Sequence, residues 1–368
     1  MATLELNSVH KYYRSGRSIV HAVDDLSLEI ADGELLAILG PSGCGKSSTM
    51  RMIAGLEAVT YGTIRMNGRE VNPLSPAERN VALAFESYAL YQHMTVGDNI
   101  GFCLSSRGVP DAERISRVTQ IAQVLGIEDL LETRPGSLSG GQQQLVSLSR
   151  AIVRKPNVIL LDEPISHLDT MTRLETSMRI RELHHRMGIT MVYVTHNQEE
   201  ALALADRIAI MENGRLLQVG TRQEIIEAPT NTFVAAFVGE PAINLIPCDL
   251  TQSAGRVTAR SEKGSFRVGL SQRQADTVVP GNGKVLVGLR PRDVYLSPPT
   301  SAAQSLSGTL RYSEFLGEST NLAVELDQGQ MLVASVTPTG RLDRGKTCTV
   351  YLDPERLLFF SPESGLRL

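Results

Sequence analysis

Gly40-Pro-Ser-Gly-Cys-Gly-Lys-Ser47 is the stretch of the sequence that decides the fold. It follows the apolar run Leu35-Leu36-Ala37-Ile38-Leu39 and precedes residues 48–54, which have a helical composition. Where a strand comes before it and a helix after it, the pattern G-x-x-x-x-G-K-[ST] predicts a phosphate-binding loop. The glycines at positions 40, 43 and 45 let the backbone approach a phosphate closely, and the start of the helix favours an anion.

The chemistry of this loop gives each polar group a role. We expect Lys46 to reach the terminal phosphates of a nucleotide as a point charge, and the Ser47 hydroxyl to bind Mg²⁺. Successive backbone N–H groups point into one concavity that holds the phosphates. The loop residues that we expect to bind the nucleotide are Ser42, Gly43, Cys44, Gly45, Lys46, Ser47 and Ser48.

The composition is that of an ordinary globular protein. A length of 368 residues favours two domains, and a net charge of −4 gives no electrostatic argument for binding nucleic acid. The four cysteines are scattered, which argues against a disulfide framework or a zinc site. We expect no secretory signal, and no apolar run reaches the roughly 20 residues that span a bilayer. Any membrane role must therefore depend on a partner.

The hydrophobic pattern changes twice along the chain. Residues 1–240 alternate strands and helices as in an α/β core, and they begin with an antiparallel β segment over residues 1–33. Inside this core, residues 87–155 have a helical pattern and are predicted to form an insertion. Residues 241–368 contain short alternating segments separated by Gly, Pro and Ser, which predict a small all-β barrel.

Individual elements can also be predicted. The apolar period and the glycine stops indicate helices over residues 111–126 and 170–187, and a third helix over about 141–155. Residues 81–85 are predicted to form a buried strand. One side of the helix over residues 170–187 carries the apolar residues Met171, Leu174, Met178 and Met187.

Two predicted strands end in residues suited to phosphate chemistry. In Leu160-Leu161-Asp162-Glu163-Pro164, Asp162 can enter the Mg²⁺ shell and Glu163 can polarise an attacking water as general base. Strand ends often carry acidic residues, but a preceding phosphate loop favours the catalytic interpretation. Val194-Thr195-His196 ends the next buried strand, where His196 can hydrogen-bond a γ-phosphate. A purely structural role is the alternative for His196.

A second anion site is predicted where a helix begins at Leu138-Ser139-Gly140-Gly141-Gln142. One chain does not need two such sites for one triphosphate. A dimer does, if each chain presents this site to the nucleotide held by the other. A simple helix N-cap is the alternative for this stretch. Ser166-His167-Leu168-Asp169 can carry a contact across the same dimer, and there an N-cap and the contact can hold together. The residues assigned to nucleotide binding here are Ser139, Gly140, Gly141, Gln142 and Asp169.

Taken in order, these stretches resemble the ATPase subunit of ATP-binding cassette (ABC) transporters, most closely the maltose-type importers of sugars, polyols and related solutes. Leu289-Arg290-Pro291-Arg292 resembles the Arg-Pro-Glu element of that family's C-terminal oligonucleotide-fold regulatory domain. The resemblance implies a P-loop NTPase core with antiparallel β and helical subdomains, followed by an all-β, OB-fold-like domain. Further matching stretches are Pro76-Ala77-Glu78-Arg79, Ser87-Tyr88-Ala89-Leu90-Tyr91, Ala205-Asp206-Arg207-Ile208 and residues 233–239.

The resemblance also implies cofactors and partners. ATP and Mg²⁺ are the cofactors, and Tyr13 matches the aromatic that stacks on adenine, with Tyr12 as its competitor. The region 87–95 is expected to lie against two transmembrane permease subunits, which work with an extracytoplasmic solute-binding protein. The ATPase forms a homodimer, or a heterodimer with a second ABC ATPase, peripherally at the cytoplasmic face of the inner membrane. Nucleic acid is not an expected partner.

Several residues depart from the family's pattern. Glu86 stands where the family has a glutamine that touches Mg²⁺ and the attacking water, so we expect Glu86 to be a catalytic and metal-binding position with an added charge. We hypothesise that this charge reduces hydrolysis or changes its gating. Gln143 and Leu145 replace arginines, and the loss of two cations beside the partner's nucleotide would weaken dimer closure. Gln92 and His167 replace a proline and an asparagine.

Three interpretations follow, and the leading one is an ATP-hydrolysing subunit that energises an importer. The second is a catalytically weakened or non-catalytic subunit in a heterodimeric ATPase pair, which the departures favour and the retained Glu163 and His196 oppose. The third is an ATPase acting on ribosomes or DNA, which the single cassette opposes. Sugars and polyols lead as solutes, while glycerol phosphate esters, polyamines, ferric iron and other anions stay open.

Overall fold

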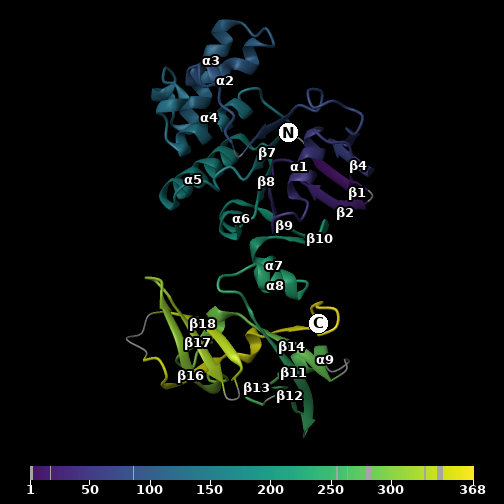
Figure 1. Cartoon of the computed structure of the whole chain (residues 1–368), viewed down its shortest axis with the longest axis vertical. Helices are drawn as coiled ribbons and strands as arrows, with labels where there is room; N and C mark the ends of the chain where they lie inside the picture. Colours follow the sequence, from purple (N-terminus) through teal and green to yellow (C-terminus); the bar gives the residue numbers. More distant parts are fainter. Residues whose placement is uncertain are drawn as a thin grey trace. The chain divides into compact units, whose positions relative to one another are not determined.

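The computed structural model describes residues 3–16, 18–85, 87–253, 256–262, 264–278, 283–326, 329–337 and 343–368. These residues form two compact units, Met1–Gln223 and Glu224–Leu368, drawn in Figure 1. The predicted domain boundary at residue 240 stays a prediction. None of the helices in the described ranges combines the length and the hydropathy that crossing a membrane requires.

The first unit begins with a four-stranded antiparallel sheet in the order β2-β1-β4-β5. The alternation in the sequence explains its packing, because Leu4 and Leu6 are fully buried while Glu5 between them is not. A long hairpin pairs Leu4 with Ile30 and Leu6 with Leu28. The strands are β1 (Leu4–Ser15), β2 (Ser18–Ile30), β4 (Tyr61–Met66) and β5 (Arg69–Glu70).

The central sheet of this unit has the strand order β10-β9-β3-β8-β7-β6. Strands β9, β3, β8, β7 and β6 are parallel to their neighbours, and β10 returns antiparallel to β9 through the Asn213-Gly214 turn. Continuous apolar runs such as β3 are buried along their whole length, as expected for strands covered on both faces. The strands are β3 (Leu35–Leu39), β6 (Val81–Ala84), β7 (Val158–Asp162), β8 (Thr190–Thr195), β9 (Arg207–Glu212) and β10 (Arg215–Gly220).

Helices complete the first unit. Between β6 and β7 the chain forms the predicted helical insertion, whose helices α2, α3 and α4 are gathered together in Figure 1. Gly126 and Gly188 end α3 and α5 in the left-handed conformation, as the glycine stops in the sequence indicated. The helices are α1 (Lys46–Ala54), α2 (Val96–Ser105), α3 (Asp111–Leu125), α4 (Gly140–Ile152), α5 (Thr170–Met187) and α6 (Gln198–Leu204).

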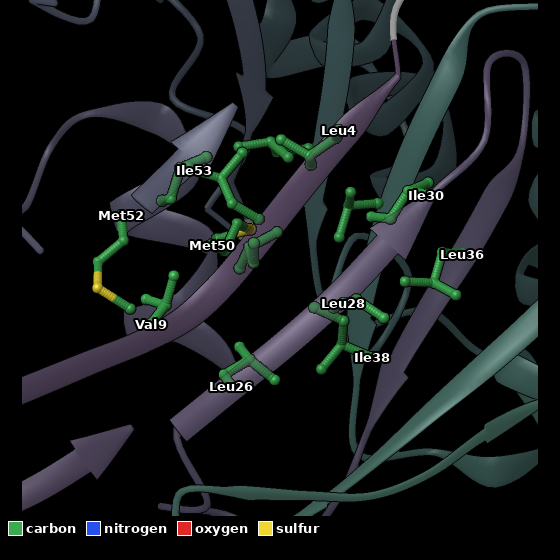
Figure 2. Packing of buried hydrophobic residues seen from close by; sticks show 14 of the residues in the cluster. Leu4, Val9, Leu26, Leu28, Ile30, Leu36, Ile38, Met50, Met52 and Ile53 are labelled. Carbon is green, nitrogen blue, oxygen red and sulfur yellow. The ribbon is translucent and has the colours of Figure 1, made fainter. Parts of the chain in front are cut away.

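One hydrophobic core joins the two sheets of this unit to α1, the helix that follows the phosphate loop. The helix contributes Met50, Ile53 and Ala54, whose spacing of three and four positions brings them to one face, together with Met52. Because this face is anchored in the core, the start of α1 is held in a fixed place. Figure 2 shows the cluster, with Leu4, Val9, Leu26, Leu28, Ile30, Leu36 and Ile38 from the strands beside Met50, Met52 and Ile53.

The structure differs from the sequence predictions at three element details. Strand β6 ends at Ala84, so Phe85 lies outside it and is partly exposed. The helix predicted to reach residue 155 ends at Ile152. The apolar side of α5 faces solvent, with Met171, Leu174 and Met178 exposed by 66%, 57% and 64%. The helix instead packs through the neighbouring residues Thr176, Ile180, Leu183 and His184.

The second unit contains two five-stranded sheets, in the orders β13-β12-β11-β14-β20 and β15-β19-β16-β17-β18. Both sheets contribute to one core, which confirms the predicted all-β, barrel-like domain. Its helices are α8 (Thr232–Phe237) and α9 (Gln272–Val278), and α7 (Arg222–Glu227) spans the division between the units. The strands are β11 (Asn244–Ser253), β12 (Arg256–Ser261), β13 (Arg267–Gly269), β14 (Lys284–Leu289), β15 (Val294–Tyr295), β16 (Gln304–Phe315), β17 (Thr320–Leu326), β18 (Met331–Val336), β19 (Thr347–Leu352) and β20 (Leu358–Phe360).

Candidate functional site

Three predicted site stretches leave the central sheet at the same edge. In the parallel register, Leu39 at the end of β3 lies opposite Thr195 of β8, and Asp162 at the end of β7 lies opposite Val194. The residues that follow these strand ends are Gly40, His196 and Glu163. The carboxyl ends of parallel strands are where α/β sheets place ligands. The topology therefore gathers the phosphate loop, the predicted base and the predicted histidine.

The phosphate loop is shaped by glycines that no other residue can replace. A β-carbon at Gly40 would lie 2.2 Å from the Met211 carbonyl oxygen, and one at Gly45 would lie 2.3 Å from the Ala22 carbonyl oxygen. Gly45 also has φ of 105°, in the left-handed region, immediately before the first turn of α1. The sequence spaces these glycines so that the loop closes over the start of the helix.

Lys46 is almost completely buried at this helix start, with 5% of its surface exposed. Its ammonium group donates hydrogen bonds to the Gly40 and Pro41 carbonyl oxygens, at 2.7 and 3.0 Å. In the described part of the chain, no carboxylate forms an ion pair with it. The third donor of the ammonium meets only the weak acceptor Cys44 Sγ, at 3.9 Å, so a phosphate oxygen would be a better partner for this buried, unneutralised cation. This observation supports the nucleotide role of the loop.

The metal candidates lie around the same loop. Ser47 is exposed in the first turn of α1, and Asp162 is partly exposed at the end of β7. A hydroxyl and a carboxylate are the hard oxygen ligands that Mg²⁺ takes in nucleotide sites. The third candidate, Glu86, lies outside the described residues, so its predicted catalytic and metal role stays a prediction. Ser42 and Gly43 are exposed on the loop, where a ligand can reach them.

Glu163 and His196 are in direct contact. His196 Nδ1 lies 3.0 Å from Glu163 Oε1, and 51% of the histidine side chain is exposed. Glu163 has φ of 44°, a left-handed conformation that is uncommon for a residue other than glycine, and its N–H donates to the Val194 carbonyl oxygen at 2.9 Å. Strained backbone of this kind concentrates at active sites because the surrounding structure has to hold it. The contact orients the carboxylate that was predicted to be the general base.

A buried network behind His196 was missed in the sequence. The Tyr193 and Thr195 hydroxyls both donate to Glu200 Oε2, at 2.8 and 2.9 Å, and Glu200 is 4% exposed. Burial, followed by the charge and hydrogen bond of Glu200, raises the pKa of Tyr193 well above its usual value. The network therefore fixes the end of β8 from inside the protein. The signal in the sequence was a glutamate four residues after His196, on a helix otherwise rich in Ala and Leu.

Tyr13, and not Tyr12, lies beside the phosphate loop. The Tyr13 hydroxyl is 3.2 Å from the Ser48 hydroxyl and donates to Glu57. Burial, together with the Glu57 hydrogen bond, raises the pKa of Tyr13. Tyr12 instead packs against His21, with ring centroids 4.1 Å apart. Of the two candidates for stacking on a base, the structure therefore brings only Tyr13 to the helix that follows the loop.

The predicted second anion site forms the start of α4. The Ser139 hydroxyl accepts a hydrogen bond from the Gln142 N–H, and the Gln142 side chain accepts one from the Ser139 N–H, at 3.3 and 2.9 Å. Gly141 is required because a β-carbon there would lie 2.5 Å from Thr172 Cγ2. Asp169 caps α5 by accepting from the Thr172 N–H, which lowers the pKa of its carboxyl. Both stretches therefore cap helices, and their predicted contacts with a partner's nucleotide stay predictions.

This second site is not joined to the phosphate loop of its own chain. Within the described ranges, no hydrogen bond connects residues 138–142 with residues 40–48. Gln143 and Leu145, which stand near this site in place of the family's arginines, make contacts within their own chain. Gln143 donates to the Leu138 carbonyl oxygen at 3.2 Å, and Leu145 is 6% exposed. Leu145 is therefore buried within its own chain, and the expected effect of the two replacements on dimer closure stays a prediction.

Arg150 is a second residue that the sequence did not reveal. It lies near the end of α4 and donates to the Ala89 and Tyr88 carbonyl oxygens, at 2.7 and 2.9 Å. Both carbonyl-bearing residues are left-handed, with φ of 46° and 55°. The helix that Ser139 caps, α4, therefore also holds the loop that was predicted to face a permease. Burial lowers the pKa of Arg150.

Comparisons with known proteins decide which family uses this arrangement. The ABC transporter family matches residues 23–166, and the TOBE domain family matches residues 287–360. The sn-glycerol-3-phosphate import ATP-binding protein UgpC of Cupriavidus necator is 40% identical over the full length of both chains. The xylose/arabinose import ATP-binding protein XacK of Haloferax volcanii is 41% identical over 99% of this chain and 95% of its own.

The chain belongs to the ABC transporter ATPases. A solved structure agrees, namely a dimeric ATP-binding cassette in a post-hydrolysis state with ADP and phosphate bound. The sequence of that solved chain is 29% identical to this one. The match covers 59% of this chain and 98% of the solved chain, with a TM-score of 0.53. The predicted family, fold class and ABC-type ATPase activity are confirmed, including the OB-fold-like character of the second unit. This ABC ATPase has the import ATP-binding proteins as its full-length relatives.

Proposed function

We propose that this ABC ATPase energises the import of a small polar solute, a sugar, a polyol or a glycerol phosphate ester, through a membrane permease. The full-length similarity to import ATP-binding proteins for sn-glycerol-3-phosphate and for xylose and arabinose supports the solute class. The observation that carries the hydrolytic part is the Glu163–His196 contact at the sheet edge from which the phosphate loop also starts. The protein acts peripherally at the cytoplasmic face of the inner membrane.

In this proposal each loop group has a task. Lys46 exchanges a loop carbonyl for a terminal phosphate oxygen, and the N–H groups of the loop hold the remaining phosphates. Ser47, Asp162 and Glu86 would hold Mg²⁺, which supplies neutralisation of the charge that develops on the phosphates. Tyr13 stacks on the adenine, and the contact of its hydroxyl with Ser48, in the first turn of α1, supports this role.

Hydrolysis itself depends on two side chains of this chain. Glu163 accepts a proton from the attacking water, and His196 holds the carboxylate in place while the exposed part of its ring faces the γ-phosphate. The strained backbone at Glu163 keeps the carboxylate oriented before the nucleotide arrives. These intact groups favour a competent enzyme over the catalytically weakened alternative.

We further propose that two ATP molecules are enclosed between two copies, or between this chain and a similar one. Ser139, Gly140, Gly141 and Gln142 at the start of α4 would contact the nucleotide held by the other copy. The separation of this helix start from its own phosphate loop supports the arrangement. Asp169 lies at the start of α5 next to it, since Gly141 packs on Thr172. Two permease subunits and an extracytoplasmic solute-binding protein complete the transporter.

Hydrolysis by the purified full-length chain tests the proposal. We expect ATP hydrolysis that needs Mg²⁺ and that stops when the metal is chelated. His196→Ala should lower the rate at least 100-fold while ATP binding persists, because positioning of the base is lost and nucleotide contacts remain. Transport by proteoliposomes that contain the cognate permease should require the wild-type chain. Hydrolysis that is independent of both Mg²⁺ and His196 would refute the assignment.

A further inference from the structure

Thr195 is the residue that precedes His196 at the end of β8, and its side chain is fully buried. The hydroxyl donates a hydrogen bond to Glu200 Oε2 at 2.9 Å and accepts one from the Asn197 N–H at 3.0 Å. A hydroxyl has one donor and two acceptor positions, so this one is used in both senses at once. Thr195 therefore ties the strand to the residues on the far side of His196.

The segment that follows His196 is held at the same time. Asn197 caps α6, since its side-chain oxygen accepts from the N–H groups of Glu199 and Glu200, at 2.8 and 3.3 Å. His196 is thus the single residue between the last residue of the strand and the cap of the helix. Because both of its neighbours are held, the backbone of His196 has little freedom to move.

The same strand end also holds the predicted general base. The Val194 carbonyl oxygen, one residue before Thr195, accepts from the Glu163 N–H at 2.9 Å. His196 Nδ1, one residue after Thr195, lies 3.0 Å from Glu163 Oε1. Thr195 thus stands between the two contacts that Glu163 makes with this strand end. Its position determines how far the imidazole lies from the carboxylate.

Glu200 anchors this strand end at a cost in free energy. It is 4% exposed, and its Oε2 atom accepts from both the Tyr193 and Thr195 hydroxyls, at 2.8 and 2.9 Å. The other oxygen, Oε1, is buried and accepts no hydrogen bond from the residues that the structure describes. A buried oxygen without a partner is unfavourable, and a role in function is one physical reason for a protein to keep it.

We propose that Thr195, held by Glu200, is a positioning residue for ATP hydrolysis, which sets the place of His196 relative to Glu163 before the nucleotide binds. This role rests on the proposed function, in which Glu163 accepts the proton from water and His196 faces the γ-phosphate. Thr195 and Glu200 act through the histidine, because their own side chains are buried. Such placement matters for catalysis, since a displacement of about 1 Å can lower a rate roughly 100-fold.

Steady-state ATP hydrolysis by the full-length Thr195→Val variant tests the proposal. Valine keeps the β-branched shape and the strand preference of threonine and puts a methyl group in place of the hydroxyl. We expect kcat to fall roughly 10- to 100-fold, with a KM for ATP within about twofold of the wild-type value, because the phosphate loop is unchanged. Thr195→Ser, which keeps the hydroxyl, should recover most of the wild-type kcat.

Thr190→Val is the matched control. Thr190 lies at the other end of β8, is also fully buried, and accepts a hydrogen bond from the Gly33 N–H at 3.0 Å, as Thr195 does from the Asn197 N–H. Both valine variants should have a lower melting temperature than the wild type, but Thr190→Val should keep kcat within about threefold of the wild-type value. Equal kcat values for the two valine variants would overturn the proposal.

A double-mutant cycle with His196→Ala distinguishes a failure of this proposal from a failure of the proposed function. In the His196→Ala background, Thr195→Val should lower the residual kcat less than about threefold, because no histidine is left to position. An equal loss in both backgrounds would overturn the proposal, whereas a wild-type rate in His196→Ala alone would refute the proposed function.

Glu200→Leu supplies a second variant if Thr195→Val does not fold. Leucine removes the acceptor of the same hydrogen bond, so kcat should fall in the same way while the KM for ATP stays at the wild-type value. A wild-type kcat in Glu200→Leu would equally overturn the proposal.

Discussion

Arg150→Ala is the substitution whose effect can be worked out most fully from the structure. The guanidinium group donates two hydrogen bonds to backbone carbonyl oxygens of the loop at residues 88–89, and its charged carbon lies 5.7 Å from the Tyr91 ring centroid. Hydrogen bonds to a charged group contribute roughly 1.5–3 kcal/mol each, so the pair stabilises the loop by roughly 3–6 kcal/mol. Alanine in place of Arg150 removes both bonds.

Without these two hydrogen bonds, the loop at residues 88–89 would keep an unfavourable backbone conformation. Tyr88 and Ala89 are both left-handed, and this conformation costs a residue other than glycine roughly 1–2 kcal/mol. Without Arg150 the present conformation is therefore disfavoured by roughly 2–4 kcal/mol, which reduces it to a few per cent of molecules or less. The proposed catalytic residues Glu163 and His196 do not contact Arg150, so the intrinsic rate of hydrolysis should change less than threefold.

Amide hydrogen exchange measures directly how well the conformation of this loop is maintained. We expect the amides of residues 87–91 in Arg150→Ala to lose protection, while stimulation of the ATPase by the cognate permease is lost. Arg154→Ala is the matched control, since Arg154 lies just after the same helix and donates to the Val81 carbonyl oxygen instead. Equal exchange of the loop in both variants would refute the reasoning, and so would normal permease stimulation of Arg150→Ala.

Three further predictions concern the ATP site. Tyr13→Ala should raise the KM for ATP about tenfold, which corresponds to the roughly 1–1.5 kcal/mol of an aromatic stack. Tyr12→Ala should leave the KM unchanged. Equal effects of the two substitutions in steady-state assays would contradict the assignment of Tyr13. Glu86→Gln should change the ATPase rate of the chain, alone and with its permease, and an unchanged rate in both assays would remove Glu86 from the mechanism. Glu200→Ala should destabilise the protein by roughly 2–4 kcal/mol, because the buried Tyr193 and Thr195 hydroxyls lose their acceptor, and a melting temperature equal to that of wild type would contradict this.

Local patterns in the sequence were sufficient to predict much of this fold. The strand, glycine loop and helix around Gly40-Pro-Ser-Gly-Cys-Gly-Lys-Ser47 appear as β3, loop and α1, because each part depends on neighbouring residues. The Asp162-Glu163 and His196 strand ends meet at one edge because parallel strands must end together. The successful predictions used the hydrophobic period of the sequence, the glycines that end helices and the common direction of parallel strands.

The sequence failed where contacts join residues far apart in the chain. Arg150 and its loop are separated by 61 and 62 positions, and nothing local to either indicates the pairing. The exposed apolar side of α5 is a failure of a different kind. Period alone locates an apolar stripe on a helix, but it does not tell which side the rest of the protein covers, and here Ile180 and Leu183 face inward.

Single-turnover hydrolysis by Glu163→Gln tests the central claim most directly. Glutamine keeps an oxygen that can accept the hydrogen bond from His196, so ATP and Mg²⁺ should bind as in the wild type, but it cannot accept a proton from water. General-base catalysis typically contributes 10²- to 10⁴-fold, and the account predicts a loss of rate in that range with unchanged ATP affinity. A wild-type rate of ATP cleavage by Glu163→Gln would contradict the account.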